Sequence, residues 1–191
     1  TPLAASRAQR TADSLDQNRG LPLAATRAAR FTTSEGTWMS LDVSPDGRTI
    51  VFDMLGDLYT IPAAGGAATR LTSGLPHDMQ PRFSPDGRRI AFVSDKSGDD
   101  NLWVINADGS GARQISKGIA DAFRSPEWTP EGQYIVVSRA APLAGLEKLW
   151  LYHIDGGTGL EMVGGAPGLR LMGAAFGPDG RYVWYHQRNG T

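Results

Sequence analysis

The chain has 191 residues, a formal net charge of −1 and 40% hydrophobic residues, which fits one soluble domain or a large part of one. It offers neither the basic face of a nucleic-acid-binding protein nor the roughly 20 unbroken apolar residues of a membrane span. Because it contains no cysteine, disulfides, thiol catalysis and cysteine-bound metals are excluded for this chain, and the redox compartment stays open. The 24 glycines and 12 prolines indicate many tight turns and hence an all-β fold.

The N-terminal segment precedes any repeat. Residues 1–27 are rich in Ala, Arg, Gln and Ser and lack a sustained apolar face, which predicts a flexible extension. Within residues 28–37, the stretch from Ala29 to Thr33 has the composition of a short strand. The chain begins at Thr1 without an initiator methionine or an apolar leader. We therefore expect that a leader has been removed or that the chain is a fragment.

A turn motif then occurs four times, at intervals of 40, 45 and 48 residues. Proline presets φ for the first corner of a type I turn, the carboxylate can accept nearby backbone N–H groups, and glycine takes the left-handed position. Each copy is therefore predicted to close a three-residue hairpin loop with a bulge between two antiparallel strands. The four copies are Ser44-Pro45-Asp46-Gly47, Ser84-Pro85-Asp86-Gly87, Thr129-Pro130-Glu131-Gly132 and Gly177-Pro178-Asp179-Gly180.

The second half of each repeat adds a strand with a Leu-aromatic pair, a glycine-containing turn and a short fourth strand. Four antiparallel strands in roughly 40 to 45 residues are the period of a β-propeller blade. The paired residues are Leu58-Tyr59, Leu102-Trp103 and Leu149-Trp150. The predicted blades are residues 38–76, 77–120, 121–168 and, in part, 169–191.

The predicted fold is thus an incomplete β-propeller of about three and a half blades. Propellers close with about four to eight blades, because each blade buries its faces against its neighbours. We expect the remaining blades further along the same polypeptide. A strand from the far terminus often completes the last blade of a ring, and residues 28–37 are placed to be that strand.

The repeated Phe-Ser-Pro-Asp-Gly-Arg-x-Ile-x-Phe core, followed by Leu-Trp and Asp-Gly, resembles the TolB-like propeller repeats. The resemblance covers about residues 38–191. Such repeats occur in the periplasmic protein of the Tol system, in prolyl-oligopeptidase-type serine peptidases and in metal-dependent amidohydrolases. The resemblance therefore implies the fold more directly than the function.

The stretch from Glu35 to Phe52, continuing to Leu55-Gly56-Asp57-Leu58-Tyr59, looks like the start of the propeller in secreted bacterial amidohydrolases. This resemblance implies a periplasmic or secreted hydrolase of C–N bonds. Its catalytic barrel, with a metal ion such as zinc, would lie further along the chain, and the propeller would be a non-catalytic scaffold or substrate gate. The alternatives are a TolB-like binding propeller with a protein or peptide ligand, and the propeller of a serine peptidase.

No catalytic constellation is visible in the sequence itself. An amidohydrolase barrel needs a His-x-His pair, whereas His77, His153 and His186 lie far apart. A Gly-x-Ser-x-Gly elbow and a phosphate-binding glycine loop are also absent. We therefore assign no catalytic, cofactor or metal residue. An Asp-rich loop could bind calcium, but without an ordered ligand pattern it is better interpreted as a solvated hairpin; its carboxylates are Asp95, Asp99 and Asp100.

Equivalent positions in successive blades suggest two further features. The aromatic side chains are interpreted as packing between blades. These are Tyr59, Trp103 and Trp150, and Phe83, Trp128 and Phe176. Asp42, Arg82 and Glu127 also occupy one position in three blades, with alternating charge. We favour ion pairing between blades for this row; the alternative is a polar binding rim at the central channel. His77, Asp78 and Arg124 complete the candidate rim.

Overall fold

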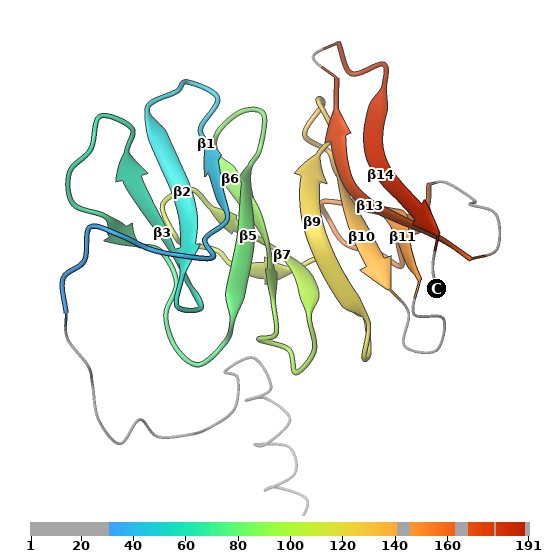
Figure 1. The fold of residues 1–191 in the computed structure, drawn as a ribbon, viewed down its shortest axis with the longest axis horizontal. Helices are drawn as coiled ribbons and strands as arrows, with labels where there is room; N and C mark the ends of the chain where they lie inside the picture. The colour runs from blue at the N-terminus through green and yellow to red at the C-terminus, as the bar shows by residue number, and fades with distance from the viewer. Residues whose placement is uncertain (1–30, 141–145, 163–167, 178, 190–191) are drawn as a thin grey trace, which may run out of the picture.

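The computed structural model describes residues 31–140, 146–162, 168–177 and 179–189. Three four-stranded antiparallel sheets and one two-stranded sheet follow one another in chain order, from blue to red in Figure 1. The predicted all-β fold, an incomplete β-propeller, is confirmed. The described residues form no helix, and accordingly no helix among them could cross a membrane.

Each four-stranded sheet is an antiparallel meander in which every strand pairs with the next in sequence. We call the four sheets blades 1 to 4. Blade 1 consists of β1 (Leu41–Val43), β2 (Thr49–Met54), β3 (Asp57–Pro62) and β4 (Thr69–Arg70). Blade 2 consists of β5 (Asp78–Phe83), β6 (Arg89–Ser94), β7 (Asn101–Asn106) and β8 (Arg113–Gln114). Blade 3 consists of β9 (Ala122–Trp128), β10 (Tyr134–Ala140), β11 (Glu147–His153) and β12 (Leu160–Glu161), and blade 4 of β13 (Leu169–Phe176) and β14 (Val183–Asn189).

The repeated turn joins the first two strands of each blade, as predicted. In blade 1, Gly47 has a φ of 70° and its N–H donates to the carbonyl of Ser44. The loop is four residues long rather than three, because Ser44 pairs with Thr49. The hydroxyl of Ser44 accepts the N–H of Thr49 at 2.9 Å, and the carboxylate of Asp46 accepts the N–H of Arg48 at 3.1 Å. The side chains of Asp46 and Ser44 thus accept the backbone N–H groups that the longer loop leaves without a backbone partner.

The central strand of blade 2 shows why these strands read as continuous apolar runs. Successive side chains of β6 point to opposite faces of the sheet. Ile90 and Phe92 pack with blade 1, whereas Ala91 and Val93 pack with blade 3. Both faces are buried, so the four consecutive residues from Ile90 to Val93 are all apolar.

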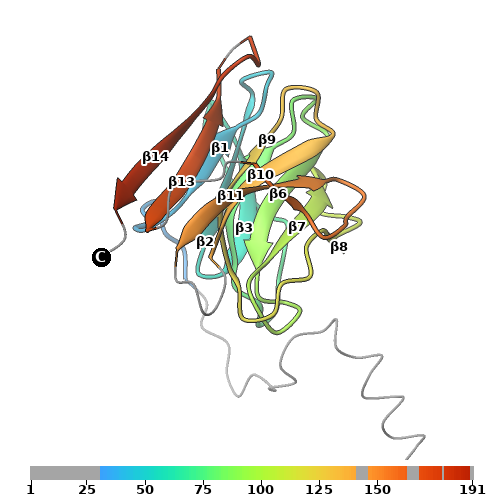
Figure 2. The same cartoon turned by 90° about the vertical axis from the view of Figure 1, so that its right-hand side faces the viewer.

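The turns themselves also stack from blade to blade. A Cβ built on Gly87 would lie 3.4 Å from Cδ of Pro45, and one built on Gly132 would lie 3.5 Å from Cδ of Pro85. Each proline ring therefore lies against the glycine of the next turn. Figure 2 views this stack of sheets from the side of blade 4.

The outward faces of blades 1 and 4 are less buried than the faces between blades. Phe52 and Tyr59 stack at 5.6 Å on the outer face of blade 1, and on blade 4 the indole of Trp184 is 69% exposed. Residues 32–36 lie beside the outer face of blade 1 and border a hollow of about 490 Å³ there. No strand is present over residues 31–40, so the predicted strand is absent in its described part. The predicted extension, residues 1–27, lies outside the described residues, and the ring-closing role of residues 28–37 stays a prediction.

Candidate functional site

The first strands of successive blades lie side by side, since β1 contacts β5, β5 contacts β9 and β9 contacts β13. They carry the row of alternating charge. Arg82 Nε lies 3.8 Å from Glu127 Oε2, and both side chains are about one-third exposed. Asp42 contacts the next blade differently, because its Oδ2 accepts the backbone N–H of Phe83 at 2.8 Å. The ion pair expected between blades is therefore present between blades 2 and 3.

The electrostatics of this row centre on Glu127. Burial raises the pKa of Glu127 from 4.5 to about 7, and the negative charge of Asp42 adds to the increase, whereas Arg82 opposes it. Arg82 is only partly available to neutralise this carboxylate, because its Nη1 donates to the carbonyls of Leu41 at 3.2 Å and Pro81 at 2.8 Å. Glu127 can therefore exchange a proton near neutral pH.

His77 and Asp78 lie apart from this row, at the end of the sheets opposite the Pro-Asp-Gly turns. They line a hollow of about 350 Å³ between blades 1 and 2. Two exposed apolar side chains also line it, those of Trp38, which is fully exposed, and Leu55, which is 80% exposed. Both residues have positive φ, 60° and 55°, a conformation that costs energy for residues with a Cβ atom.

Asp78 is a buried part of this hollow. Burial raises its pKa, while hydrogen bonds from Ser94 and Thr72 lower it. His77 is more accessible, and its backbone N–H donates to Oδ1 of Asp95 at 2.7 Å. At this hollow, therefore, the carboxyl group of Asp78 is buried, whereas the imidazole of His77 is exposed to a ligand.

Arg124 belongs to the next blade junction. Its Nη1 lies 3.4 Å from Oε1 of Glu147, and Arg170 Nη1 lies 3.6 Å from the other oxygen of the same carboxylate. Burial raises the pKa of Asp100 and the negative charge of Asp95 adds to the increase, whereas Arg124 and His77 oppose it. The six candidates therefore do not form one cluster. Asp42, Arg82 and Glu127 form the row, His77 and Asp78 line the hollow between blades 1 and 2, and Arg124 pairs with Glu147.

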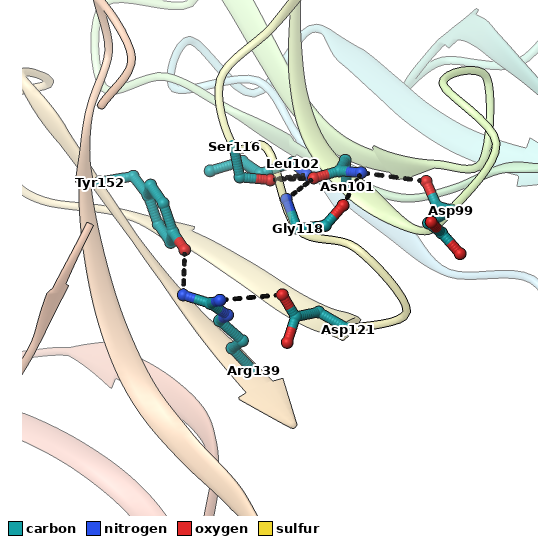
Figure 3. A network of polar contacts seen from close by, with 8 residues as sticks. All are labelled: Asp99, Asn101, Leu102, Ser116, Gly118, Asp121, Arg139 and Tyr152. Atoms are coloured by element: carbon teal, nitrogen blue, oxygen red, sulfur yellow. Dashed lines mark hydrogen bonds and ion pairs between the residues drawn. The ribbon is translucent and has the colours of Figure 1, made fainter. Parts of the chain in front are cut away.

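Two polar networks that sequence reasoning missed flank the connection between blades 2 and 3 (Figure 3). In the first, the buried Asn101 amide accepts hydrogen bonds from Ser116 Oγ and Gly118 N, both at 2.7 Å. In the second, the guanidinium of Arg139 donates to Asp121 and Tyr152. These residues come from separate strands and loops, so no spacing in the sequence marks them as neighbours.

The remaining sequence interpretations concern aromatics and metals. Trp103 and Trp128 are each 3% exposed and lie in the cores between blades, in agreement with a packing role. Within the described residues, no group of three or more His, Cys, Asp or Glu side chains is placed to hold a metal ion, the Asp-rich loop included.

The sequence pattern of the Tricorn protease N-terminal beta propeller domain matches residues 47–191. This chain belongs to that family. The description of that domain as a propeller agrees with the meander of four-stranded blades.

The relatives of this chain include TolB proteins and a Tricorn protease homolog. The chain is 28% identical over 168 residues to the Tol-Pal system protein TolB of Wolinella succinogenes, covering 85% of this chain and 39% of that protein. It is 26% identical over 156 residues to Tricorn protease homolog 1 of Streptomyces coelicolor, covering 77% of this chain and 14% of that protein. The crystal structure of TolB from Acinetobacter baumannii superposes with a TM-score of 0.64 at 18% identity, over 79% of this chain and 38% of that one. The chain thus spans less than half the length of these relatives, and its TolB-like fold is established.

Proposed function

We propose that this chain is a non-catalytic part of a longer propeller protein and that it binds a segment of a partner protein at the hollow beside Trp38. The observation that carries this proposal is the exposed pair Trp38 and Leu55, held at positive φ on the rim of that hollow. Strained backbone persists where the surrounding structure demands it, and such positions are often functional.

The chemistry of the hollow favours a peptide segment over a small polar solute. Tryptophan is prominent among the residues that dominate the energy of protein interfaces, since it buries a large rigid area. Here the indole and the Leu55 side chain can cover an apolar residue of the partner, and the imidazole of His77 offers a hydrogen bond at the same place. The TolB and Tricorn relatives support a binding propeller within a longer protein.

Site-specific photo-crosslinking tests this proposal in the protein expressed from its complete coding sequence. A benzoylphenylalanine is introduced in place of Trp38 or Leu55. A control carries it in place of Arg88, which is exposed in a turn at the opposite end of the sheets. We expect adducts with a second protein from the first two positions and none from the third. An adduct at Trp38 that joins it to later residues of the same polypeptide would show that its own chain covers the indole, and would refute the proposal.

A second proposal concerns the parent protein. We propose that the parent is a hydrolase, and that the stretch from Glu35 to Phe52 favours a metal-dependent amidohydrolase with a metal ion such as zinc in a downstream barrel. The relationship to Tricorn protease homolog 1 supports a hydrolytic parent but favours a peptidase. In either case the propeller acts as a scaffold or substrate gate, and a periplasmic or secreted location is proposed with it.

The coding sequence after Thr191 distinguishes these parents. A His-x-His motif after a strand would establish the amidohydrolase, and a Gly-x-Ser-x-Gly elbow would establish a serine peptidase. A reading frame that ends after the last blade would exclude both and leave a TolB-like binding protein.

A further inference from the structure

A second hollow, of about 380 Å³, lies at the junction of blades 2 and 3. Its volume falls in the range of sites for small organic molecules. The described residues that line it include two cations and no carboxylate: Lys117, Gly118, Arg139, Tyr152, Gly157 and Thr158. This hollow is separate from the hollow between blades 1 and 2, which Trp38 and His77 line.

The guanidinium of Arg139 is held in place before any ligand arrives. Its Nη2 donates to Oδ2 of Asp121 at 2.8 Å, and its Nη1 donates to the phenol oxygen of Tyr152 at 3.1 Å (Figure 3). Its Cζ also lies 4.3 Å from the centroid of the Trp150 ring. A charged group fixed in this way loses little conformational freedom on binding, which favours affinity.

The phenol of Tyr152 has a defined hydrogen-bonding direction. Arginine can only donate, so the phenol oxygen accepts and its own hydrogen remains available. Among the described residues, no hydrogen bond donated by this phenol is present. Burial raises the pKa of Tyr152, so the phenol stays protonated at neutral pH. Tyr152 can therefore donate to a group in the hollow.

The charge at the hollow is positive. Asp121 neutralises one of the two cations, Arg139, and leaves the exposed ammonium of Lys117 as the net charge. An ammonium, a phenol and the remaining guanidinium N–H groups are all donors, and together they match the acceptor oxygens of an oxyanion. We infer that this hollow binds a small organic anion through its phosphate or carboxylate group.

Isothermal titration calorimetry on the protein expressed from its complete coding sequence tests this inference, with inorganic phosphate, phenyl phosphate and benzoate as probes at constant ionic strength. We expect phenyl phosphate or benzoate to bind more tightly than inorganic phosphate, because the hollow also holds an organic body. Tighter binding of phenyl phosphate than of benzoate would identify a phosphate ligand, and the reverse a carboxylate ligand.

Variants assign the binding to this hollow. Lys117→Gln and Tyr152→Phe should each weaken binding at least fivefold, because the first removes the ammonium charge and the second removes the phenol donor, while the packed side chains stay in place. Arg88→Gln removes the same charge as Lys117→Gln from an exposed turn and should leave binding unchanged. The inference is wrong if no probe binds, or if Lys117→Gln and Arg88→Gln weaken binding equally. Neither result would affect the proposal that a partner protein binds at the hollow beside Trp38.

Discussion

The buried carboxylate of Asp53 in blade 1 accepts the backbone N–H of Gln80 in blade 2 at 2.7 Å. Gln80 stands at a register shift in β5 with a φ of 56°, and its own amide oxygen accepts the N–H of Ser125 in blade 3 at 2.7 Å. At the next junction, Ser138 Oγ accepts the N–H of Gly173 at 3.0 Å. At each of the three junctions, therefore, a side chain of one blade binds a bulged N–H of the next.

Replacement of Asp53 by alanine should destabilise the protein. Asp53 is 8% exposed, and its other oxygen accepts the N–H of Ser40 at 2.9 Å, so the variant leaves two N–H groups without their partner. We expect a loss of about 2–3 kcal/mol in the free energy of unfolding, measured by urea denaturation. Asp53→Asn, which retains one acceptor, should lose less. Equal stability of all three proteins would contradict this account.

The positive φ angles at the bulges predict opposite effects of glycine and alanine. Ser125 has a φ of 50°, so Ser125→Gly should raise the free energy of unfolding by about 1 kcal/mol. Gly173 has a φ of 63°, and an added Cβ would meet no atom closer than 3.5 Å. Gly173→Ala should therefore lower stability by about 1 kcal/mol through backbone strain alone. Thermal denaturation of both variants checks the pair, and effects of the same sign would refute the explanation.

Glu127 should make stability depend on pH near neutrality. Burial raises its pKa from 4.5 to about 7 in the folded protein, so its protonated form favours folding. That contribution is complete below about pH 4.5 and is lost as the pH rises through 7. Because the side chain is 33% exposed, we discount the effect to about 1–2 kcal/mol.

The variant Glu127→Gln isolates this effect from other carboxyl groups. Its side chain cannot ionise, so its stability does not fall as the pH rises through 7. The amount by which its free energy of unfolding exceeds that of the natural protein should therefore be about 1–2 kcal/mol larger at pH 8 than at pH 4.5. Urea denaturation at a series of pH values measures the difference. A difference that stays constant with pH would mean that Glu127 titrates as in the unfolded chain.

Asn101 provides a matched test of buried against exposed polar groups. It is 1% exposed, and its Nδ2 donates to Ser97 Oγ and to the carbonyls of Asp99 and Gly118, each at 3.2 Å. Asn101→Ala should cost about 3 kcal/mol of unfolding free energy, because it leaves several buried partners unpaired. Asn106→Ala, at an exposed position on the same strand, should cost less than about 1 kcal/mol. Similar losses would show that the Asn101 network adds little stability.

Local features of the fold could be read directly from the sequence. The Pro-Asp-Gly turns and the paired Leu-aromatic strands specify their own conformation, since proline, glycine and strand alternation act over a few residues. The blade was predictable for this reason. Even so, the predicted loop of three residues was one residue too short, because the hydroxyl of Ser44 rather than a backbone carbonyl accepts the N–H of Thr49.

Contacts between blades were decided by the tertiary structure. Asp53 and Gln80 are 27 residues apart. Arg139 in β10 binds Tyr152, which lies in β11, and Asp121, which lies in the loop before β9. The row of Asp42, Arg82 and Glu127 was found because the repeat brings its members into register, whereas the Arg139 hollow has no counterpart in the repeat pattern. The sequence by itself thus determined the turns, the strands and the blade. The polar contacts and hollows between blades depend on how residues distant in sequence meet, and this was settled when the sheets packed against one another.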